Sequence, residues 1–144
     1  MKVSSILKRK GTDVVTVQPN LTVAAAAREM TKKEIGSLVV SNDGQTVLGL
    51  IGERDIVRGL AYYGAHVGEL RVSDLMNRSV VTCDPEQTVT STMAAMTQYR
   101  ARHLPVVQNH ALCGLVSIGA AVKHRLEELE TEANILREAF IARQ

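Results

Sequence analysis

An internal repeat is the feature of this sequence that most constrains its fold. The segment Val14 to Pro19 resembles Val80 to Pro85, and the two prolines lie 66 positions apart. The same spacing separates Leu38 from Leu104, and it shortens by one only after the turn that follows. Because the spacing is constant within elements and changes in a loop, we interpret the pattern as a duplicated unit.

Both copies carry the same series of local signals. A β-branched segment ends at a proline, which has no N–H for a strand ladder, and an apolar stripe of helical spacing follows. Thr22 is expected to cap the first of these helices, and Asn42-Asp43-Gly44 is a strong hairpin signal. The predicted strands are Val14 to Val17, Ser37 to Val40, Val47 to Ile51, Val80 to Thr82, His103 to Val107 and Leu112 to Val116, and closing helices run from Glu53 to about Tyr62 and from Ile118 onward.

The size of each copy makes the two depend on each other. A unit of about 65 residues, in a chain with only 3% aromatic residues, buries too little surface to be comfortably stable alone. We therefore predict an α+β (α/β) fold in which two strand-helix-strand-strand-helix units pack sheet to sheet about a pseudo-twofold axis. The expected boundaries are 1–66 and 67–125, followed by a helical tail at 126–144. Such packing creates two related clefts, where ligand pockets commonly form.

Composition and charge argue against several partners. The formal net charge is +2, and the one local basic run, Lys8-Arg9-Lys10, is expected in a solvated surface turn. We therefore predict no binding to nucleic acid or membrane, and the scarcity of aromatic residues points the same way for single strands. Met1 to Ser5 lacks the apolar core of a signal peptide, and the two cysteines form no paired pattern. A cytoplasmic protein with free thiols is the expected class.

Motifs of enzymatic chemistry are missing from the sequence. It contains no phosphate-binding loop, dinucleotide fingerprint, zinc-protease motif or nucleophile elbow, and its histidines and cysteines lack metal-ligand spacing. Glu53 and Asp55 are two positions apart on a predicted helix, so their carboxylates face different directions. We predict no catalytic residues and no metal.

The order and spacing of the duplicated segments resemble the tandem cystathionine-beta-synthase (CBS) domain pair, or Bateman module. The resemblance extends from Val3 to about Leu126 and is closest to small stand-alone bacterial CBS-pair proteins. It rests on Val14 to Pro19, Ile35 to Val40, Gly49 to Val57, Val80 to Thr82, Arg102 to Val107 and Gly114 to Ser117.

This resemblance implies a ligand: an adenine nucleotide (AMP, ADP or ATP), NADH or S-adenosylmethionine, bound between the copies. In the family, the binding residues follow the third strand as Gly, two apolar residues, Ser or Thr, two variable residues and Asp. In this chain the Asp position holds Asp55 and Ala120, and the hydroxyl position holds Gly52 and Ser117. A carboxylate accepts hydrogen bonds from ribose hydroxyls, and a hydroxyl at a helix start suits a phosphate. Each copy lacks one of these groups, so we expect unequal binding.

Structural roles for the same residues stay open. Asp55 is also a favourable charge at a helix start, Ser117 is also an ordinary N-cap, and Arg54, Arg58 and Arg102 suit surface ion pairs as well as phosphate. Segments that would hold the purine are equally suited to the core. The remaining predicted binding residues are Val14, Val15, Thr16, Ile35, Gly36, Ser37, Leu38, Glu53, Val80, Val81, Thr82, His103, Leu104 and Pro105.

The tail has one apolar face. Leu126, Leu129, Ala133, Leu136 and Phe140 are spaced 3, 4, 3 and 4 residues apart, as on an amphipathic helix. This face packs either on its own module or against a second subunit. We favour the second subunit and predict a homodimer.

The sequence thus favours a regulatory, ligand-sensing module that passes its bound state to an unidentified protein by a change of shape. Two other functions remain open. One is a structural dimerisation unit with vestigial sites, which Gly52 and Ala120 favour, and the other is a nucleotide-hydrolysing enzyme.

Overall fold

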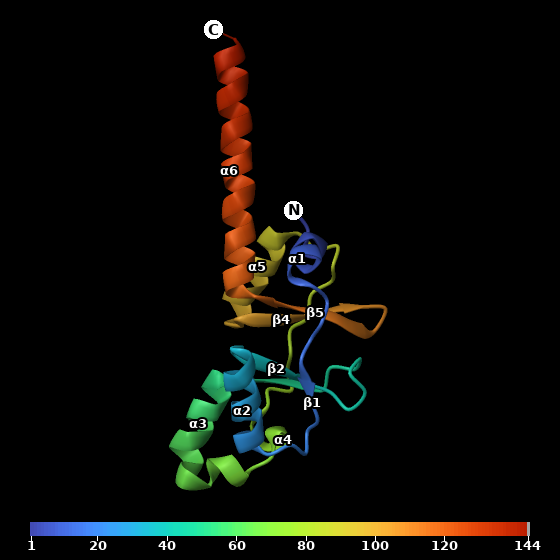
Figure 1. The fold of residues 1–144 in the computed structure, drawn as a ribbon, viewed down its shortest axis with the longest axis vertical. Helices are drawn as coiled ribbons and strands as arrows, with labels where there is room; N and C mark the ends of the chain where they lie inside the picture. Colours follow the sequence, from blue (N-terminus) through green and yellow to red (C-terminus); the bar gives the residue numbers. More distant parts are fainter. Residues whose placement is uncertain (144) are drawn as a thin grey trace.

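The computed structural model describes residues 1–143, in which two similar units stack through their sheets (Figure 1). We call the elements from β1 to α3 repeat 1 and those from α5 to α6 repeat 2. Repeat 1 contains β1 (Thr16–Val17), α2 (Val23–Lys33), β2 (Ser37–Val40), β3 (Gly49–Gly52) and α3 (Glu53–Tyr63). Repeat 2 contains α5 (Val89–Tyr99), β4 (His103–Gln108), β5 (Ala111–Ser117) and α6 (Ile118–Ala142). A short helix precedes each repeat, α1 (Val3–Lys10) and α4 (Val72–Leu75), and the 3-10 helix η1 (Gly64–Glu69) follows α3.

The first helix of each repeat begins and ends in the same way. The side chains of Thr22 and Thr88 accept hydrogen bonds from the backbone N–H three residues further on, at 3.2 and 3.0 Å. Glu34 and Arg100 end these helices in the left-handed conformation, with φ values of 54° and 53°. The predicted cap at Thr22 is confirmed, and the shared geometry at a spacing of 66 confirms the duplication.

The sheets of the two repeats differ at their first strand. In repeat 1, β1 is parallel to β2, which is antiparallel to β3; in repeat 2, β4 and β5 are antiparallel. The prediction of a strand at Val80 to Thr82 is wrong, because only Cys83 pairs with β4, at Val106. Extending this ladder toward Val81 requires a backbone N–H at Pro105, which proline lacks.

The helices that precede the repeats are exchanged between the two cores. Val3, Ile6 and Leu7 of α1 are buried with the core of repeat 2, whereas Val72 of α4 and Met76 belong to the core of repeat 1. Each core is therefore completed by the short helix that precedes the other repeat, which ties the two small units together. The predicted domain boundaries remain predictions, at 1–66, 67–125 and 126–144. The structure does not divide the chain in this way, since neither core is built from one continuous segment.

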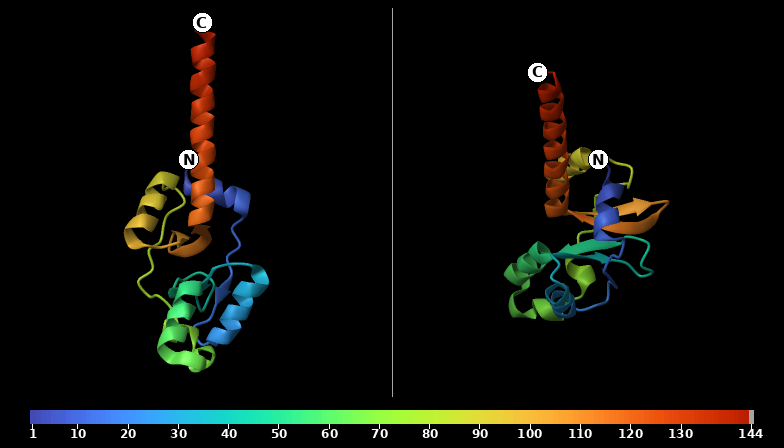
Figure 2. Two further views of the ribbon diagram at one scale, coloured as in Figure 1. Left: turned by 90° about the vertical axis from the view of Figure 1, so that its left-hand side faces the viewer. Right: turned by 45° about the horizontal axis from the view of Figure 1, so that its top comes forward.

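The closing helix of repeat 2 and the predicted tail form a single helix, α6, of 25 residues. Its first turns pack on the body through Ala121 and His124, and the rest projects away from both repeats (Figures 1 and 2). Within residues 1–143, no helix combines the length and apolar character needed to cross a membrane.

Lys8-Arg9-Lys10 are exposed at the surface, as predicted, but they form the last turn of α1 rather than a turn between elements. Positive side chains are favourable there, since the helix dipole is negative at this end.

Candidate functional site

Two clefts lie between the repeats, and residues of both repeats line each of them. The first, which we call the Asp55 cleft, has a volume of about 210 Å³. The second, the Ser117 cleft, has a volume of about 380 Å³. Each cleft combines residues around the end of the last strand of one repeat, β3 or β5, with residues at or just before the start of β4 or β2 in the other, a pairing that the sequence did not reveal.

The clefts meet at Gly36, Ser37 and His103, which line both of them. Ser37 pairs with Gly52 across β2 and β3, as His103 pairs with Ser117 across β4 and β5. Equivalent strand ends of the two repeats therefore face each other at the centre of the molecule.

The central polar groups differ in their environment. Burial, reinforced by the nearby charge of Lys10, lowers the pKa of His103 below its usual 6.5, while Glu53 opposes this shift. The imidazole is therefore neutral at pH 7 and presents both a donor and an acceptor. The Ser37 hydroxyl is buried without a hydrogen-bond partner in residues 1–143. The His103 imidazole can therefore exchange hydrogen bonds with a polar ligand, whereas the Ser37 hydroxyl is buried.

The carboxylate of Asp55 has a structural task at the start of α3. Its Oδ2 atom accepts a hydrogen bond from the backbone N–H of Gly52 at 2.8 Å. Burial raises the pKa of Asp55, and the Gly52 bond and the charge of Arg58 act in the opposite direction. The Oδ1 atom has no hydrogen bond within the described residues, so it retains acceptor capacity beside the cleft.

Positive charge gathers around the Asp55 cleft. Arg54, Arg58, Arg100 and Arg102 all line it, and none of them forms an ion pair within residues 1–143. Arg100 is not among the predicted binding residues, and no motif marks it; the structure shows that its repeat equivalent, Glu34, lines the other cleft. This grouping provides donors for an anion, because arginine side chains match phosphate geometry.

The Ser117 cleft is more apolar, with Val14, Val15, Ile35 and Leu115 in its wall. The Ser117 side chain caps α6 by accepting a hydrogen bond from the Ala120 N–H at 3.1 Å, which leaves its own hydroxyl proton free to donate.

Residues just before β1 also line the Ser117 cleft, and the sequence analysis missed them. They are Lys10, Gly11 and Asp13. The Lys10 ammonium donates to the carbonyl of Leu115 at 3.3 Å, which ties the end of α1 to β5. The basic run Lys8-Arg9-Lys10 is the sequence signal that marks this edge of the cleft.

The structure brings part of the predicted set to the clefts. Gly36, Ser37, Gly52, Glu53, Arg54, Asp55, Arg102 and His103 line the Asp55 cleft, and Val14, Val15, Ile35, Gly36, Ser37, His103 and Ser117 line the Ser117 cleft. The remaining predicted residues line neither cleft: Thr16, Leu38, Val80, Val81, Thr82, Leu104, Pro105 and Ala120. Leu38 and Leu104 are fully buried in the cores, because strand neighbours point to opposite faces and Ser37 and His103 take the cleft side.

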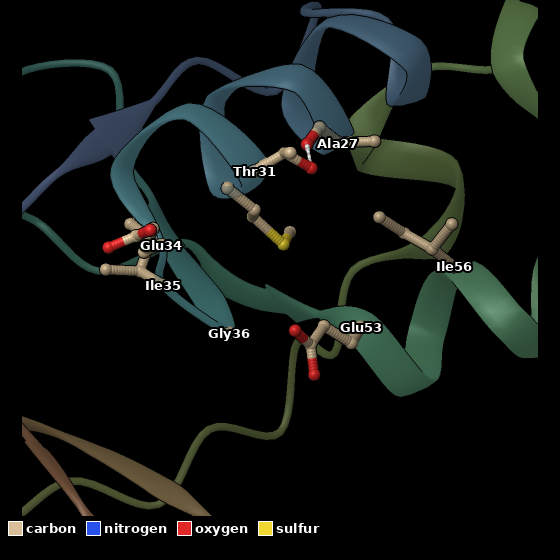
Figure 3. A pocket seen from close by; sticks show the side chains of 8 residues that line it. Ala27, Thr31, Glu34, Ile35, Gly36, Glu53 and Ile56 are labelled. Atoms are coloured by element: carbon tan, nitrogen blue, oxygen red, sulfur yellow. Dashed lines mark hydrogen bonds between the residues drawn. The ribbon is translucent and has the colours of Figure 1, made fainter.

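A third pocket, of about 500 Å³, lies within repeat 1 between α2 and α3 (Figure 3). Ala27, Ile35 and Ile56 contribute apolar surface, and the carboxylates of Glu34 and Glu53 stand at its edge. Its negative charge makes it unsuitable for a phosphate. Across residues 1–143, no group of three or more His, Cys, Asp or Glu side chains is arranged to hold a metal ion.

Comparison with known proteins agrees with the duplicated fold. A family model of the CBS domain matches this chain twice, at residues 3–62 and 72–127. The chain is 33% identical over 138 residues to the mitochondrial CBS domain-containing protein CBSX3 of Arabidopsis thaliana, covering 90% of this chain and 67% of that protein. It is also similar to the crystal structure of the CBS-domain containing protein ATU1752 from Agrobacterium tumefaciens, with a TM-score of 0.84 and 41% identity, covering 87% of this chain and 99% of that chain.

A more distant structure shares the fold alone. The CBS domain pair of protein MJ0100, solved in complex with 5′-methylthioadenosine and S-adenosyl-L-methionine, has a TM-score of 0.78 and 22% identity. The match covers 89% of this chain and 98% of that chain.

Proposed function

Because this chain belongs to the CBS-domain family and carries two copies of the domain, we propose that it is a regulatory module that binds an adenosine-containing ligand between its repeats. The observation that carries the proposal is the Asp55 cleft, where the Asp55 carboxylate lies among four arginines that form no ion pair within residues 1–143, with Glu53 as a second carboxylate in the wall. The adenosine compounds bound by the CBS pair of MJ0100 support the ligand class.

The proposed ligand places its ribose beside Asp55 and its negative groups beside the arginines. The Oδ1 atom of Asp55 accepts a ribose hydroxyl, and the bond from Gly52 to Oδ2 holds the carboxylate in position. Arg54 and Arg58 from α3 and Arg100 and Arg102 from repeat 2 reach the same phosphate from opposite sides. The ligand thus bridges the repeats, which is the geometry that a sensor requires.

The size of the Asp55 cleft links binding to a change of shape. Pockets for small ligands usually exceed about 300 Å³, whereas this cleft has about 210 Å³. We infer that a nucleotide binds better to a form in which the repeats have moved apart, because that form offers more room between them. This difference in affinity between two shapes is what allows a ligand to shift their populations.

The proposed output is the long helix α6. Its N-cap, Ser117, lines one cleft and lies beside His103 on the neighbouring strand, and His103 lines both clefts. A ligand that displaces these residues moves the start of α6. The proposed partners are a second copy of the chain and a regulated protein that responds to the position of this helix.

Calorimetric titration of the purified chain with AMP, ADP, ATP, NADH, S-adenosylmethionine and 5′-methylthioadenosine tests the proposal. We expect saturable heat from at least one compound, and unchanged ligand when the mixture is analysed afterwards by chromatography. Steady conversion to product would replace the proposal with an enzymatic function. Absence of heat from all six would favour the structural dimerisation unit, which the substituted positions Gly52 and Ala120 already make a specific second candidate.

A further inference from the structure

Helix α6 carries an apolar stripe that its own chain leaves exposed. The stripe consists of Val122, Leu126, Leu129, Ala133, Leu136 and Phe140, and the exposed fractions of its large side chains run from 38% at Val122 to 70% at Leu136. It begins at Val122, between the buried residues Ala121 and His124, and ends at Phe140 near the end of the helix. The later turns of α6 project from the body (Figure 2). Isolated exposed apolar residues are ordinary, but a continuous row of this length indicates a binding surface.

The stripe lies on a different side of α6 from the residues that pack on the body. Ala121 and His124 face the body and are 0% and 5% exposed, whereas the stripe residues Val122 and Leu126 are 38% and 59% exposed. At 100° per residue, the buried pair lies roughly 120° around the helix from the centre of the stripe. The face therefore does not pack on its own module, and a partner helix can approach it without meeting the body.

The charges beside the stripe match a second copy of the same helix. With Leu126, Ala133 and Phe140 at positions a of a heptad, Arg125 and Glu132 occupy positions g, and Glu130 and Arg137 occupy positions e. In a parallel pair, each g residue meets the e residue five positions later on the partner. Both contacts, from 125 to 130 and from 132 to 137, then join opposite charges. Glu132 and Arg137 form no other ion pair in the described residues.

We infer that α6 forms a parallel, in-register, two-stranded coiled coil with the α6 helix of a second copy of this chain. The two bodies then lie at the same end of the coil, each on the outer side of its own helix. This inference specifies the surface and orientation of the proposed homodimer. It requires no ligand, so its tests succeed or fail separately from the nucleotide titrations.

Two neighbouring residues provide a matched test of the surface. Leu136 lies on the stripe and Ile135 lies off it, and their exposed fractions are similar, 70% and 60%. We expect light scattering to give about twice the 15.7 kDa of one chain for the unmodified protein and for Ile135→Glu, and the mass of one chain for Leu136→Glu. A monomeric unmodified protein, or equal loss of the dimer in both variants, would overturn the inference.

Charge reversal tests the register. Glu132→Lys and Arg137→Glu each place like charges opposite each other in the coil, and we expect each to weaken dimerisation about three- to thirtyfold. The double variant restores opposite charges and should recover most of the affinity. Additive weakening in the double variant would contradict the parallel register.

A cysteine near the end of the helix tests the orientation. Position 143 continues the stripe as a d position, so Arg143→Cys places two thiols side by side only in a parallel pair. We expect a disulfide-linked dimer on a non-reducing gel at low protein concentration. The unmodified chain, in which Cys83 is buried and Cys113 is partly buried, serves as the control. Failure to link while the protein remains dimeric would favour the antiparallel arrangement and overturn the inference.

Discussion

The two clefts have equivalent positions in the duplicated fold, but each contains a different half of the binding pattern that the resemblance to CBS pairs implies. The Asp55 cleft has the carboxylate, lacks the hydroxyl at Gly52 and gathers four arginines. The Ser117 cleft has the hydroxyl, has alanine at the carboxylate position and presents an apolar wall.

This difference shows what a helix start requires. In α3 the carboxylate of Asp55 bonds to the N–H of Gly52, and in α6 the hydroxyl of Ser117 bonds to the N–H of Ala120. Either bond satisfies a backbone donor that the helix leaves unpaired, so one of the two side chains is enough for folding. A ligand that uses both groups has the stricter requirement. The fold can therefore persist in both repeats while the two sites diverge.

Removal of the Asp55 carboxylate should have the largest effect on ligand affinity. We expect Asp55→Ala to weaken binding of the adenosine ligand by about 1 to 3 kcal/mol, because hydrogen bonds to a charged acceptor are lost. The measurement is calorimetric titration with the ligand that binds the unmodified chain. An unchanged affinity would remove Asp55 from the proposed site.

Asp74 offers a matched control for that experiment. Its Oδ2 atom accepts a hydrogen bond from the N–H of Arg71 at 2.8 Å, the same contact that Asp55 makes with Gly52. Asp74 lines neither cleft between the repeats. Asp74→Ala should therefore lower thermal stability in a comparable way and leave ligand affinity unchanged, which separates loss of the cap from loss of the contact.

Placing a carboxylate at Ala120 in repeat 2 should reduce the difference in ligand affinity between the two clefts. At Ala120, Asp occupies the third position of α6, as Asp55 does in α3. We expect Ala120→Asp to strengthen binding at the Ser117 cleft by roughly 1 kcal/mol and to raise helix stability by about 0.3 to 1 kcal/mol. Titration should show a second binding event. The uncharged variant Ala120→Asn should show a smaller gain, and equal gains would argue against a role for the charge.

Much of the fold could be predicted from the sequence, because the duplication repeats each local signal. The Thr22 cap and the hairpin of repeat 2 follow from short-range chemistry and occur where the pattern places them. The hairpin around Asn42-Asp43-Gly44 also forms, but its loop is longer than predicted, since β3 begins at Gly49 and not at Val47. The strand predicted at Val80 to Thr82 did not form because it depended on a distant partner, Pro105, which has no N–H to donate. The packing of α1 on repeat 2 and of α4 on repeat 1 likewise depends on residues far apart in the sequence, so no local pattern predicts it.

The candidate site was less predictable for a related reason. Asp55 and Ser117 follow strands and could be located by motif, but Arg100 and Lys10 reach the clefts only through packing of one repeat against the other. Leu38 and Leu104 belong to segments that do reach the clefts, yet their side chains point into the cores. Knowing which segment reaches a cleft does not tell which of its side chains face the cleft and which face the core, because that depends on the register of each strand.

Adding the missing hydroxyl in repeat 1 should have a smaller effect than either change of charge. A Cβ atom at Gly52 would lie 3.3 Å from the carbonyl oxygen of Gly36, which already accepts a hydrogen bond from Glu53. Gly52→Ser therefore combines a small steric cost with one new donor, and we expect its affinity to exceed that of Gly52→Ala by less than about 1 kcal/mol. Equal affinities in the two variants would show that the hydroxyl contributes nothing at this position.

The smallest expected effect concerns His103, the titratable side chain that both clefts share. Because burial lowers its pKa in the folded state, the unfolded chain binds this proton more readily. The stabilising contribution is therefore present above pH 6.5 and is lost as the pH falls below it. Melting temperatures measured between pH 8 and pH 5, at about 0.1 M salt, should fall with pH in the unmodified chain and fall less in His103→Gln. Identical profiles would contradict the shift.

A phosphate-bearing ligand should change that profile. A negative group near His103 favours its protonated form, so saturating nucleotide should reduce the loss of stability below pH 6.5, whereas adenosine should not. Repeating the measurement in Asp55→Ala and in Ser117→Ala identifies the cleft that holds the phosphate. If only Asp55→Ala abolishes the effect, the phosphate is in the Asp55 cleft. If only Ser117→Ala abolishes the effect, the phosphate is in the Ser117 cleft and not in the Asp55 cleft. The same measurement distinguishes the two cases because His103 lines both clefts.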